Sequence, residues 1–302
     1  MIDLKLKLPS PLQKLTHPLL DEAKIELLIK RDDLIHREVS GNKWRKLVLN
    51  LKQAEQAGKQ KVLTFGGAYS NHIAATAAIA ARSAFEIHAM IRGEELNPNS
   101  NYCLQKAHRS GLKLHFIPRE AYRVIKQIKQ AEEIGQQWKD THLIPEGGAN
   151  QLGVNGCKGI YGEIKAPFDH LFCAAGTGTT AAGILSSLKH ERLHVVSSIK
   201  GAKMLNDDII GWQANPEKAA QLNFIDEYHF GGYGKVTNEL ITFVEQCKTA
   251  WGLELDYLYT AKAFYAMTEQ IKQGKFAEGS KLVFYHSGGL QANRGIMARQ
   301  SQ

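Results

Sequence analysis

The sequence has 302 residues and a mass of 33.6 kDa, with 43% hydrophobic and 23% charged residues. These proportions are typical of a globular chain that buries a large core, so they exclude intrinsic disorder, and the length suggests one or two domains. Lys and Arg number 38 against 30 Asp and Glu, and the resulting net charge of +8 favours anionic ligands without naming one.

Short apolar runs alternate with helical patterns along the chain. The first helical pattern begins at Trp44, repeats apolar residues every three to four positions and stops at Gly58. Further helices are predicted over 71–84 and 121–138, and buried strands over 61–67, 86–91, 113–117, 142–144, 170–175, 193–199 and 281–285. Buried parallel strands joined by crossover helices produce this alternation, so we expect an α/β protein.

The N-terminal segment and the cysteines indicate where the protein resides. Residues 1–10 include an acidic residue and lack the apolar core of a signal peptide, and no apolar run reaches a membrane-spanning length of about 18 residues. The four cysteines are far apart and form no CxxC pair, which is typical of reduced thiols. We therefore expect a soluble, cytoplasmic protein with no membrane partner.

Glycine-rich or polar turns follow the predicted strands or precede a helix at five places. Because ligands of open α/β sheets bind at the carboxyl ends of strands, these turns are candidate parts of one site. They occupy residues 40–43, 66–72, 145–150, 175–180 and 286–289. The Gly- and Asn-rich stretch 145–156 is also the best candidate for a domain boundary.

The turn made by Gly176, Thr177, Gly178, Thr179 and Thr180 follows an apolar strand and opens a helix. Such a turn exposes backbone N–H groups at a helix N-terminus and fits a phosphate. It is neither a P-loop nor a complete GxGxxG fingerprint. A tight strand-to-helix turn capped by threonine is the alternative interpretation.

Lys43 lies in a Gly-Asn-Lys turn immediately before the helix that begins at Trp44. The positive end of the helix dipole lowers the cost of losing its proton, and a neutral amine can attack an aldehyde cofactor. A lysine taken alone is far more often a solvated surface charge, so the case for Lys43 depends on its context.

Seven motifs follow one another along the chain, at residues 30–33, 40–47, 70–72, 176–180, 232–234, 259–260 and 286–289. Their order resembles that in the pyridoxal-phosphate enzymes of the 1-aminocyclopropane-1-carboxylate deaminase and D-cysteine desulfhydrase family. The resemblance covers about residues 8–298, and the GNKxRKL-type block at 41–47 is its most specific part.

The resemblance implies pyridoxal 5′-phosphate as cofactor and roles for individual residues. Lys43 would hold the cofactor covalently and carry the Cα proton, Asn71 would hydrogen-bond the cofactor's 3′ oxygen, and the turn 176–180 would bind its phosphate. Ser70, with Asn71, His72 and the neighbouring amides, would grip the substrate carboxylate, and Ser70 is also a candidate nucleophile or proton carrier. Tyr233 and Tyr259 match two active-site tyrosines that transfer protons or position the substrate.

The fold implied by the resemblance is that of the tryptophan synthase β subunit, also called fold-type II. It has two open, twisted α/β domains with the cofactor between them. The larger domain would comprise residues 1–47 and 151–302, and the smaller would comprise 48–150. The resemblance also implies a homodimer that acts on a small amino acid.

Thr260 and Ser287 depart from the true cyclopropane deaminases, which have Glu and Leu at these two places. Hydroxyls are weaker partners for the pyridine nitrogen than a carboxylate, which leaves a shallower electron sink. That suits D-cysteine desulfhydrase-like elimination to pyruvate, ammonia and sulfide better than opening of an unactivated ring. Cyclopropane deamination, another β-elimination and amino-acid racemisation remain alternatives.

Other classes of protein remain as alternatives. A nucleic-acid-binding protein is suggested by a pI near 9.2, but the basic runs 44–46 and 123–129 fit solvated helix faces and no nucleic-acid module is recognised. A metal hydrolase is disfavoured because the 12 histidines form no HExxH motif or ligand cluster, and we expect no metal. A non-catalytic member of the same family also remains open.

Overall fold

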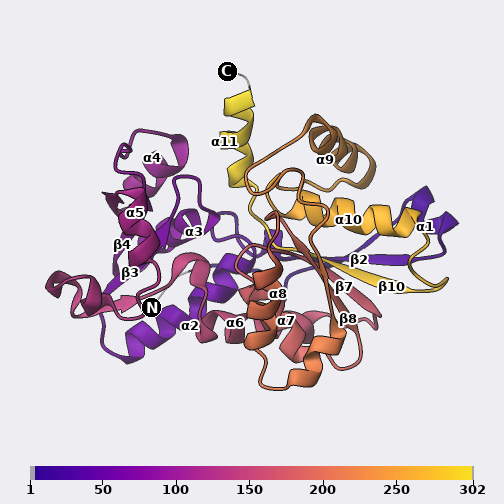
Figure 1. The fold of residues 1–302 in the computed structure, drawn as a ribbon, viewed down its shortest axis with the longest axis horizontal. Helices are drawn as coiled ribbons and strands as arrows, with labels where there is room; N and C mark the ends of the chain where they lie inside the picture. Colours follow the sequence, from indigo (N-terminus) through magenta and orange to yellow (C-terminus); the bar gives the residue numbers. More distant parts are fainter. Residues whose placement is uncertain (1–3, 301–302) are drawn as a thin grey trace.

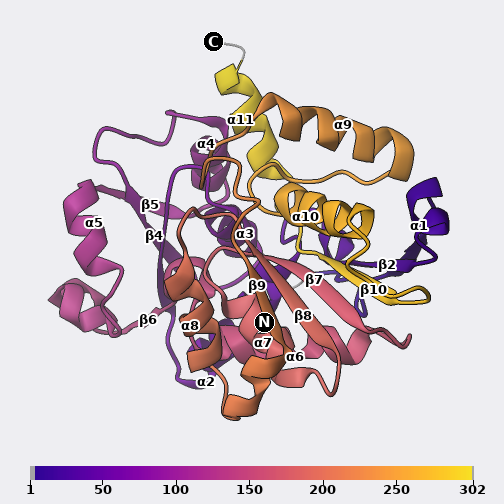
Figure 2. The same ribbon diagram turned by 45° about the vertical axis from the view of Figure 1, so that its right-hand side comes forward.

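The computed structural model describes residues 4–300, with side chains described up to residue 296, and contains two β-sheets that lie side by side (Figures 1 and 2). Helices cover the faces of both sheets, and the chain passes from one sheet to the other and back. Among the described residues, no helix is both long and apolar enough to cross a bilayer.

The larger sheet has six strands, which pair in parallel except for one antiparallel pair at an edge. Its spatial order is β1 (Leu12–Leu15), β2 (Glu26–Arg31), β10 (Lys281–His286), β7 (His170–Ala175), β8 (Arg192–Ser197) and β9 (Leu222–Ile225). Central strand β10 pairs Val283 with both Leu28 and Leu171.

Alternate side chains of the six-stranded sheet point to opposite faces and belong to two separate hydrophobic cores, as expected for a sheet buried on both faces. One core packs against α1 (Pro18–Glu22), α9 (Asn238–Trp251) and α10 (Thr260–Lys272). The other packs against α6 (Gln151–Glu163), α7 (Thr179–Ser187) and α8 (Lys203–Gly211).

The smaller sheet is entirely parallel, in the order β5 (Lys113–Ile117), β4 (Glu86–Arg92), β3 (Lys61–Gly66) and β6 (Thr141–Leu143). One face packs on α2 (Asn42–Gln56), α3 (Asn71–Ala80) and α4 (Tyr102–Arg109), and the other meets α5 (Arg119–Ile125). The last helix is α11 (Gln291–Gln300), and short 3-10 turns lie at 32–34, 131–134, 136–138, 146–148 and 216–221.

A buried ion-pair network fixes α2 to the larger sheet. Arg45 on α2 donates to Asp32, with a shortest contact of 2.5 Å, and to Glu163 of α6 at 2.8 Å. Glu163 also accepts a hydrogen bond from the fully buried Lys30 of β2 at 2.6 Å. Since a guanidinium binds carboxylates with two parallel bonds, the network sets the position of the start of α2.

The predicted strands all form, within a few residues at their ends. The helix predicted over 121–138 is wrong, since helix α5 ends at Ile125 and two 3-10 turns follow. Tyr122 and Trp138 both belong to one small core cluster on the sheet. A continuous helix would separate them by about 24 Å along its axis, so the chain must fold back. Helix α3 ends at Ala80, before the predicted limit at 84, and α2 begins at Asn42, so Lys43 lies in its first turn.

Candidate active site

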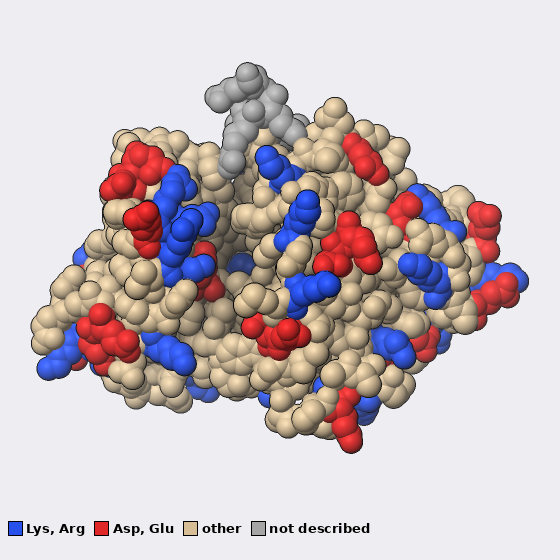
Figure 3. Space-filling model, in the orientation of Figure 1, with Lys and Arg blue, Asp and Glu red and all other residues tan. Residues whose placement is uncertain are grey.

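A cavity of about 790 Å³ lies where the carboxyl ends of β3, β4, β7 and β10 converge. The space-filling view shows a hollow between the two lobes (Figure 3). The cavity brings together most of the residues that the sequence singled out: Lys43, Ser70, Asn71, His72, Gly176, Thr177, Gly178, Thr180, Tyr233, Tyr259 and Ser287.

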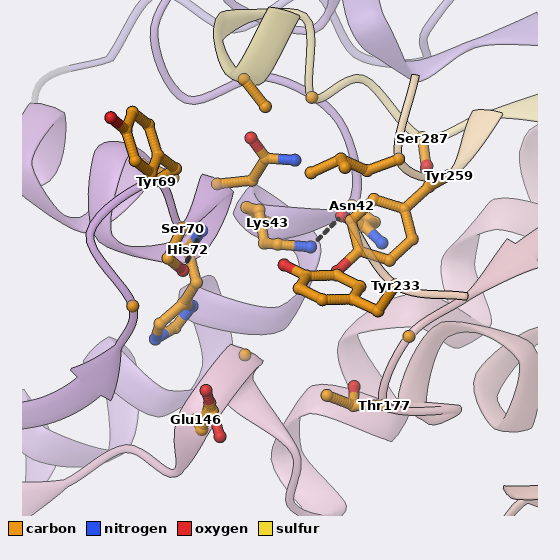
Figure 4. Close-up of a pocket in the computed structure, with 18 of the residues that line it drawn as sticks. Asn42, Lys43, Tyr69, Ser70, His72, Glu146, Thr177, Tyr233, Tyr259 and Ser287 are labelled. Carbon is orange, nitrogen blue, oxygen red and sulfur yellow. Dashed lines mark hydrogen bonds between the residues drawn. The ribbon is translucent and has the colours of Figure 1, made fainter. Parts of the chain in front are cut away.

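Lys43 extends from the first turn of α2 into the centre of this cavity (Figure 4). Its Nζ donates to Oδ1 of Asn42 at 2.8 Å, and Nδ2 of Asn42 donates to Oγ1 of Thr180 at 3.0 Å. Removal from bulk water and the neighbouring Lys46 cation lower the pKa of Lys43 to about 7. The amine can therefore be neutral, and nucleophilic, near neutral pH.

Gly41, just before Asn42, is required by a close approach of two chain segments. Its φ is +69°, and a Cβ there would lie 1.7 Å from the carbonyl oxygen of Ser287. Asn42 N donates to that same oxygen at 3.2 Å. Because glycine has no Cβ, the start of α2 can pack closely against the backbone that follows β10, next to Lys43.

The turn after β7 leads into α7, with Gly178 in the left-handed conformation as the N-cap. Lys46 reaches this turn from α2, and its Nζ donates to Oγ1 of Thr177 at 3.2 Å. Burial lowers the pKa of Lys46. A helix N-terminus beside a buried amine is a ready site for a phosphate, whose charge would also favour the ammonium form.

Ser70 is the N-cap of α3, and its Oγ accepts hydrogen bonds from the backbone N–H groups of His72 (3.2 Å) and Ile73 (3.4 Å). It therefore has a structural role at the helix N-terminus, where a substrate carboxylate could also bind. Asn71 begins the helix, and its Oδ1 accepts from Gln291 Nε2 of α11 at 2.5 Å.

His72 is buried and contacts Thr64 of β3 at 2.7 Å through its Nε2. Because the Thr64 hydroxyl donates to the carbonyl of Ile144, it accepts from His72, so Nε2 carries the ring hydrogen. Burial, together with the Lys43 and Lys46 cations, lowers the pKa of His72 to about 3. His72 is therefore a neutral side chain that lines the cavity.

Tyr233 and Tyr259 face Lys43 from the side of the larger sheet (Figure 4), with their ring centroids 5.9 Å apart. Burial and the neighbouring Tyr233 raise the pKa of Tyr259 well above its usual range, so its hydroxyl is protonated at neutral pH. The loop that carries Tyr233 is held by the buried Lys262, which donates to the carbonyls of His229 (2.9 Å) and Gly232 (3.0 Å).

Thr179 and Thr260 do not line the cavity, although the sequence grouped them with the site. Thr179 is buried, with its hydroxyl 3.0 Å from that of Thr177. The Thr260 hydroxyl donates to Asp256 Oδ2 at 2.6 Å and accepts from Asp256 N at 2.8 Å. Of the pair Thr260 and Ser287, only Ser287 lines the cavity.

Among the lining residues that the sequence did not single out individually are Asn42, Lys46, Tyr69, Glu146 and Gln291. Lys46 follows Lys43 by three positions, so shared helical spacing could have indicated that both amines face one cavity. Glu146 lies in a turn that the sequence marked as a strand end. Gln291 carries no signal, because only the fold brings α11 against α3.

The two sheets enclose a cavity that contains a half-buried lysine of low pKa and a helix N-terminus suited to an anion, an arrangement typical of a ligand-binding α/β enzyme. A family model described as "Pyridoxal-phosphate dependent enzyme" matches residues 5–288, so the chain belongs to this family.

Individual relatives agree with this assignment. The chain is 31% identical to a Thermotoga maritima protein named "Putative 1-aminocyclopropane-1-carboxylate deaminase", over 96% of both chains. It is also 31% identical to an Arabidopsis thaliana protein named "Bifunctional D-cysteine desulfhydrase/1-aminocyclopropane-1-carboxylate deaminase, mitochondrial", over 94% of this chain and 77% of that one.

Solved structures share the fold. A structure described as an ACC deaminase homologue superposes with a TM-score of 0.82, at 26% identity over 98% of this chain and 95% of that one. A hydrogen sulfide-producing enzyme from Fusobacterium nucleatum shares the fold at 14% identity, with a TM-score of 0.67 over 94% of this chain and 96% of that one. The predicted fold, family and enzyme class are confirmed.

The predicted cofactor, pyridoxal phosphate, is confirmed as well, and the residues of this chain fit it. Lys43 would offer a weakly basic amine to the aldehyde, while the N-terminus of α7 and Lys46 would offer N–H groups and a cation to the phosphate. When bound, the cofactor supplies an electron sink that stabilises negative charge at the substrate Cα.

Proposed function

We propose that the protein eliminates the β-substituent of a small amino acid, in the manner of a D-cysteine desulfhydrase, and releases pyruvate, ammonia and sulfide from cysteine. The observation that carries the proposal is the amine of Lys43, with a pKa of about 7, in a cavity shared with the α3 N-terminus. A base poised near neutral pH can remove the Cα proton of a substrate whose carboxylate lies at Ser70.

The hydroxyl of Ser287 is the proposed partner of the cofactor's pyridine nitrogen. Thr260 is less suited to this role, because the single hydrogen of its hydroxyl is already donated to Asp256. The Asp256 carboxylate accepts further bonds from the N–H groups of residues 258, 259 and 260. A hydroxyl partner leaves a modest electron sink, which suffices for a good leaving group such as a thiolate.

Further site roles belong to the same proposal. Asn71 would donate to the cofactor's 3′ oxygen, and the turn 176–180 would hold its phosphate. Tyr233 and Tyr259 are the proposed proton donors to the departing group, because both hydroxyls face Lys43 (Figure 4).

Cyclopropane deamination is the second candidate, favoured by the names of the relatives from Thermotoga maritima and Arabidopsis thaliana. Ammonia release by the holoenzyme from D-cysteine, L-cysteine, β-chloro-D-alanine and 1-aminocyclopropane-1-carboxylate separates the two activities. We expect one cysteine enantiomer to react faster than the cyclopropane. The reverse order would replace desulfhydration by ring opening.

The domain division is also proposed, with residues 1–47 and 151–302 in the larger unit and 48–150 in the smaller, of which 1–3 and 301–302 lie outside the described residues. In support, all four strands of the smaller sheet fall within 61–143. We further propose a cytoplasmic homodimer, and the free thiols of all four cysteines fit a reducing compartment.

A further inference from the structure

The wall of the cavity contains more cations than the proposed function uses. Basic side chains flank the central hollow on the face shown in Figure 3. Two carboxylates, Glu38 and Glu146, line the cavity, against six basic side chains: Lys43, Lys46, Arg92, Arg119, Lys126 and Lys235.

Two of these cations already have partners under the proposed function. Lys43 is the attachment point, and Lys46 lies at the phosphate turn beside Thr177. The substrate's α-carboxylate is assigned to Ser70 and the N-terminus of α3. The proposed function assigns no anion to the other four, which we call the outer cations: Arg92, Arg119, Lys126 and Lys235.

The outer cations differ in how far the protein itself neutralises them. Arg119 pairs with Glu95, and Lys126 Nζ lies 3.5 Å from Glu146 Oε2, which offsets the charge of that carboxylate. Glu38 is occupied by Arg82 and Lys106. No ion pair joins Arg92 or Lys235 to any carboxylate among the side chains that the structure describes.

Arg92 is held in place although it is exposed. It is the last residue of β4, and its Cζ lies 5.8 Å from the ring centroid of the buried Tyr122. Its Nη2 would be 3.5 Å from a Cβ on Gly67, in the loop that leads to Ser70. A guanidinium that lies over an aromatic ring at a strand's carboxyl end is partly fixed in position before an oxyanion binds.

We propose that the preferred substrate carries an oxyanion group on its β carbon, as a phosphate or a sulfonate, and that Arg92 binds this group. This rests on the proposed function and names its substrate class. Lys43 takes the Cα proton, and the bond from Cβ to the oxyanion group breaks with its electron pair on the departing phosphate or sulfite. Water converts the remaining fragment to pyruvate and ammonium, and no oxidation or reduction occurs.

Calorimetry on the holoenzyme tests the proposal by comparing O-phosphoserine with serine, in each enantiomer. Arg92→Gln should weaken the binding of O-phosphoserine about tenfold and change that of serine by less than about twofold. Arg109, exposed on α4 and outside the cavity lining, provides a matched control, and Arg109→Gln should leave both affinities unchanged.

Turnover separates a failure of this proposal from a failure of the elimination itself. If the wild-type enzyme releases pyruvate from none of cysteine, β-chloroalanine, O-phosphoserine and 3-sulfoalanine, the proposed function is wrong, while the binding comparison still decides the role of Arg92. An equal loss of affinity for serine and O-phosphoserine would show that Arg92 binds the α-carboxylate. That outcome, or no loss at all, overturns the proposal.

Discussion

Gln291 and Asn71 are 220 positions apart in the chain, and Gln291 Nε2 donates to Asn71 Oδ1 at 2.5 Å. The bond leaves the Asn71 amide with its Nδ2 over Gly289, where a Cβ would lie 2.7 Å away. The start of α11 therefore determines which end of the Asn71 side chain is offered to the cavity, and the free end is a hydrogen-bond donor.

Replacement of Gln291 should therefore disturb cofactor binding through Asn71. We expect Gln291→Leu to weaken pyridoxal phosphate about fivefold, the effect of one misdirected hydrogen bond, and to shift the cofactor's absorption band. Absorbance titration of the cofactor-free protein measures both effects. Gln273→Leu, an exposed change at the end of α10, is the control. An unchanged spectrum and affinity would show that Asn71 is oriented without Gln291.

The low pKa of Lys43 predicts how its reactivity depends on pH. An amine attacks an aldehyde only when unprotonated, so the rate should rise with pH through a midpoint near the pKa of about 7. Borohydride trapping of pyridoxal, which lacks the phosphate, measures this rate without involving the phosphate site. Lys46→Met should move the midpoint upward, because it removes a neighbouring cation. A midpoint near that of an ordinary lysine would contradict the assigned environment.

Lys262 is a positioning residue for the loop that carries Tyr233. Lys262→Met should leave the carbonyls of His229 and Gly232 without their donor, so we expect kcat for elimination to fall about tenfold while cofactor affinity changes little. Lys272→Met, at an exposed position on the same helix, is the matched control. Equal losses in kcat and in cofactor affinity would indicate general disruption of the fold.

Glu163, which pairs with Arg45 at the start of α2, should make the free energy of unfolding depend on pH in acid. Burial alone would raise its pKa, but hydrogen bonds from Arg45 and Lys30 outweigh burial and lower it to about 2. Since the folded-state pKa lies below the ordinary value, this carboxylate stabilises the fold above about pH 4.5, and the stabilisation is lost as the pH falls toward 2.

Urea unfolding of Glu163→Gln at several pH values tests this linkage. At pH 7 we expect a loss of about 2 kcal/mol in the free energy of unfolding, below the value for a fully buried pair because Glu163 is partly exposed. The difference from wild type should shrink between pH 4.5 and 2. Glu278→Gln, which removes an exposed pair, should cost less than about 0.5 kcal/mol. A loss that does not vary with pH would point to packing instead of charge.

Much of the fold could be predicted because buried parallel strands leave long apolar runs. Three strands of the larger sheet were not identified: the short strands β1 and β9, which leave weaker patterns, and β2, whose apolar run of three residues is flanked by charged ones. Trp138 lies in a helical pattern, but it packs edge-on against His88 and His115, a tertiary contact that overrides the local periodicity.

The candidate site was predictable where local motifs carry it, as at Lys43 and the turn 176–180. It was not predictable where distant segments meet. Thr260 follows Tyr259 in the sequence, but it turns away from the cavity because Asp256 takes its hydroxyl. Gln291 and Arg92 reach the cavity only through the arrangement of the two sheets.

The central claim is that Lys43 is the point of cofactor attachment. Borohydride reduction of the holoenzyme followed by peptide mapping tests it directly, because reduction fixes the cofactor to the amine that holds it. We predict that the label lies on Lys43 and disappears in Lys43→Ala, which should fold normally. A label on Lys46, the other amine of α2 that lines the cavity, would contradict the account.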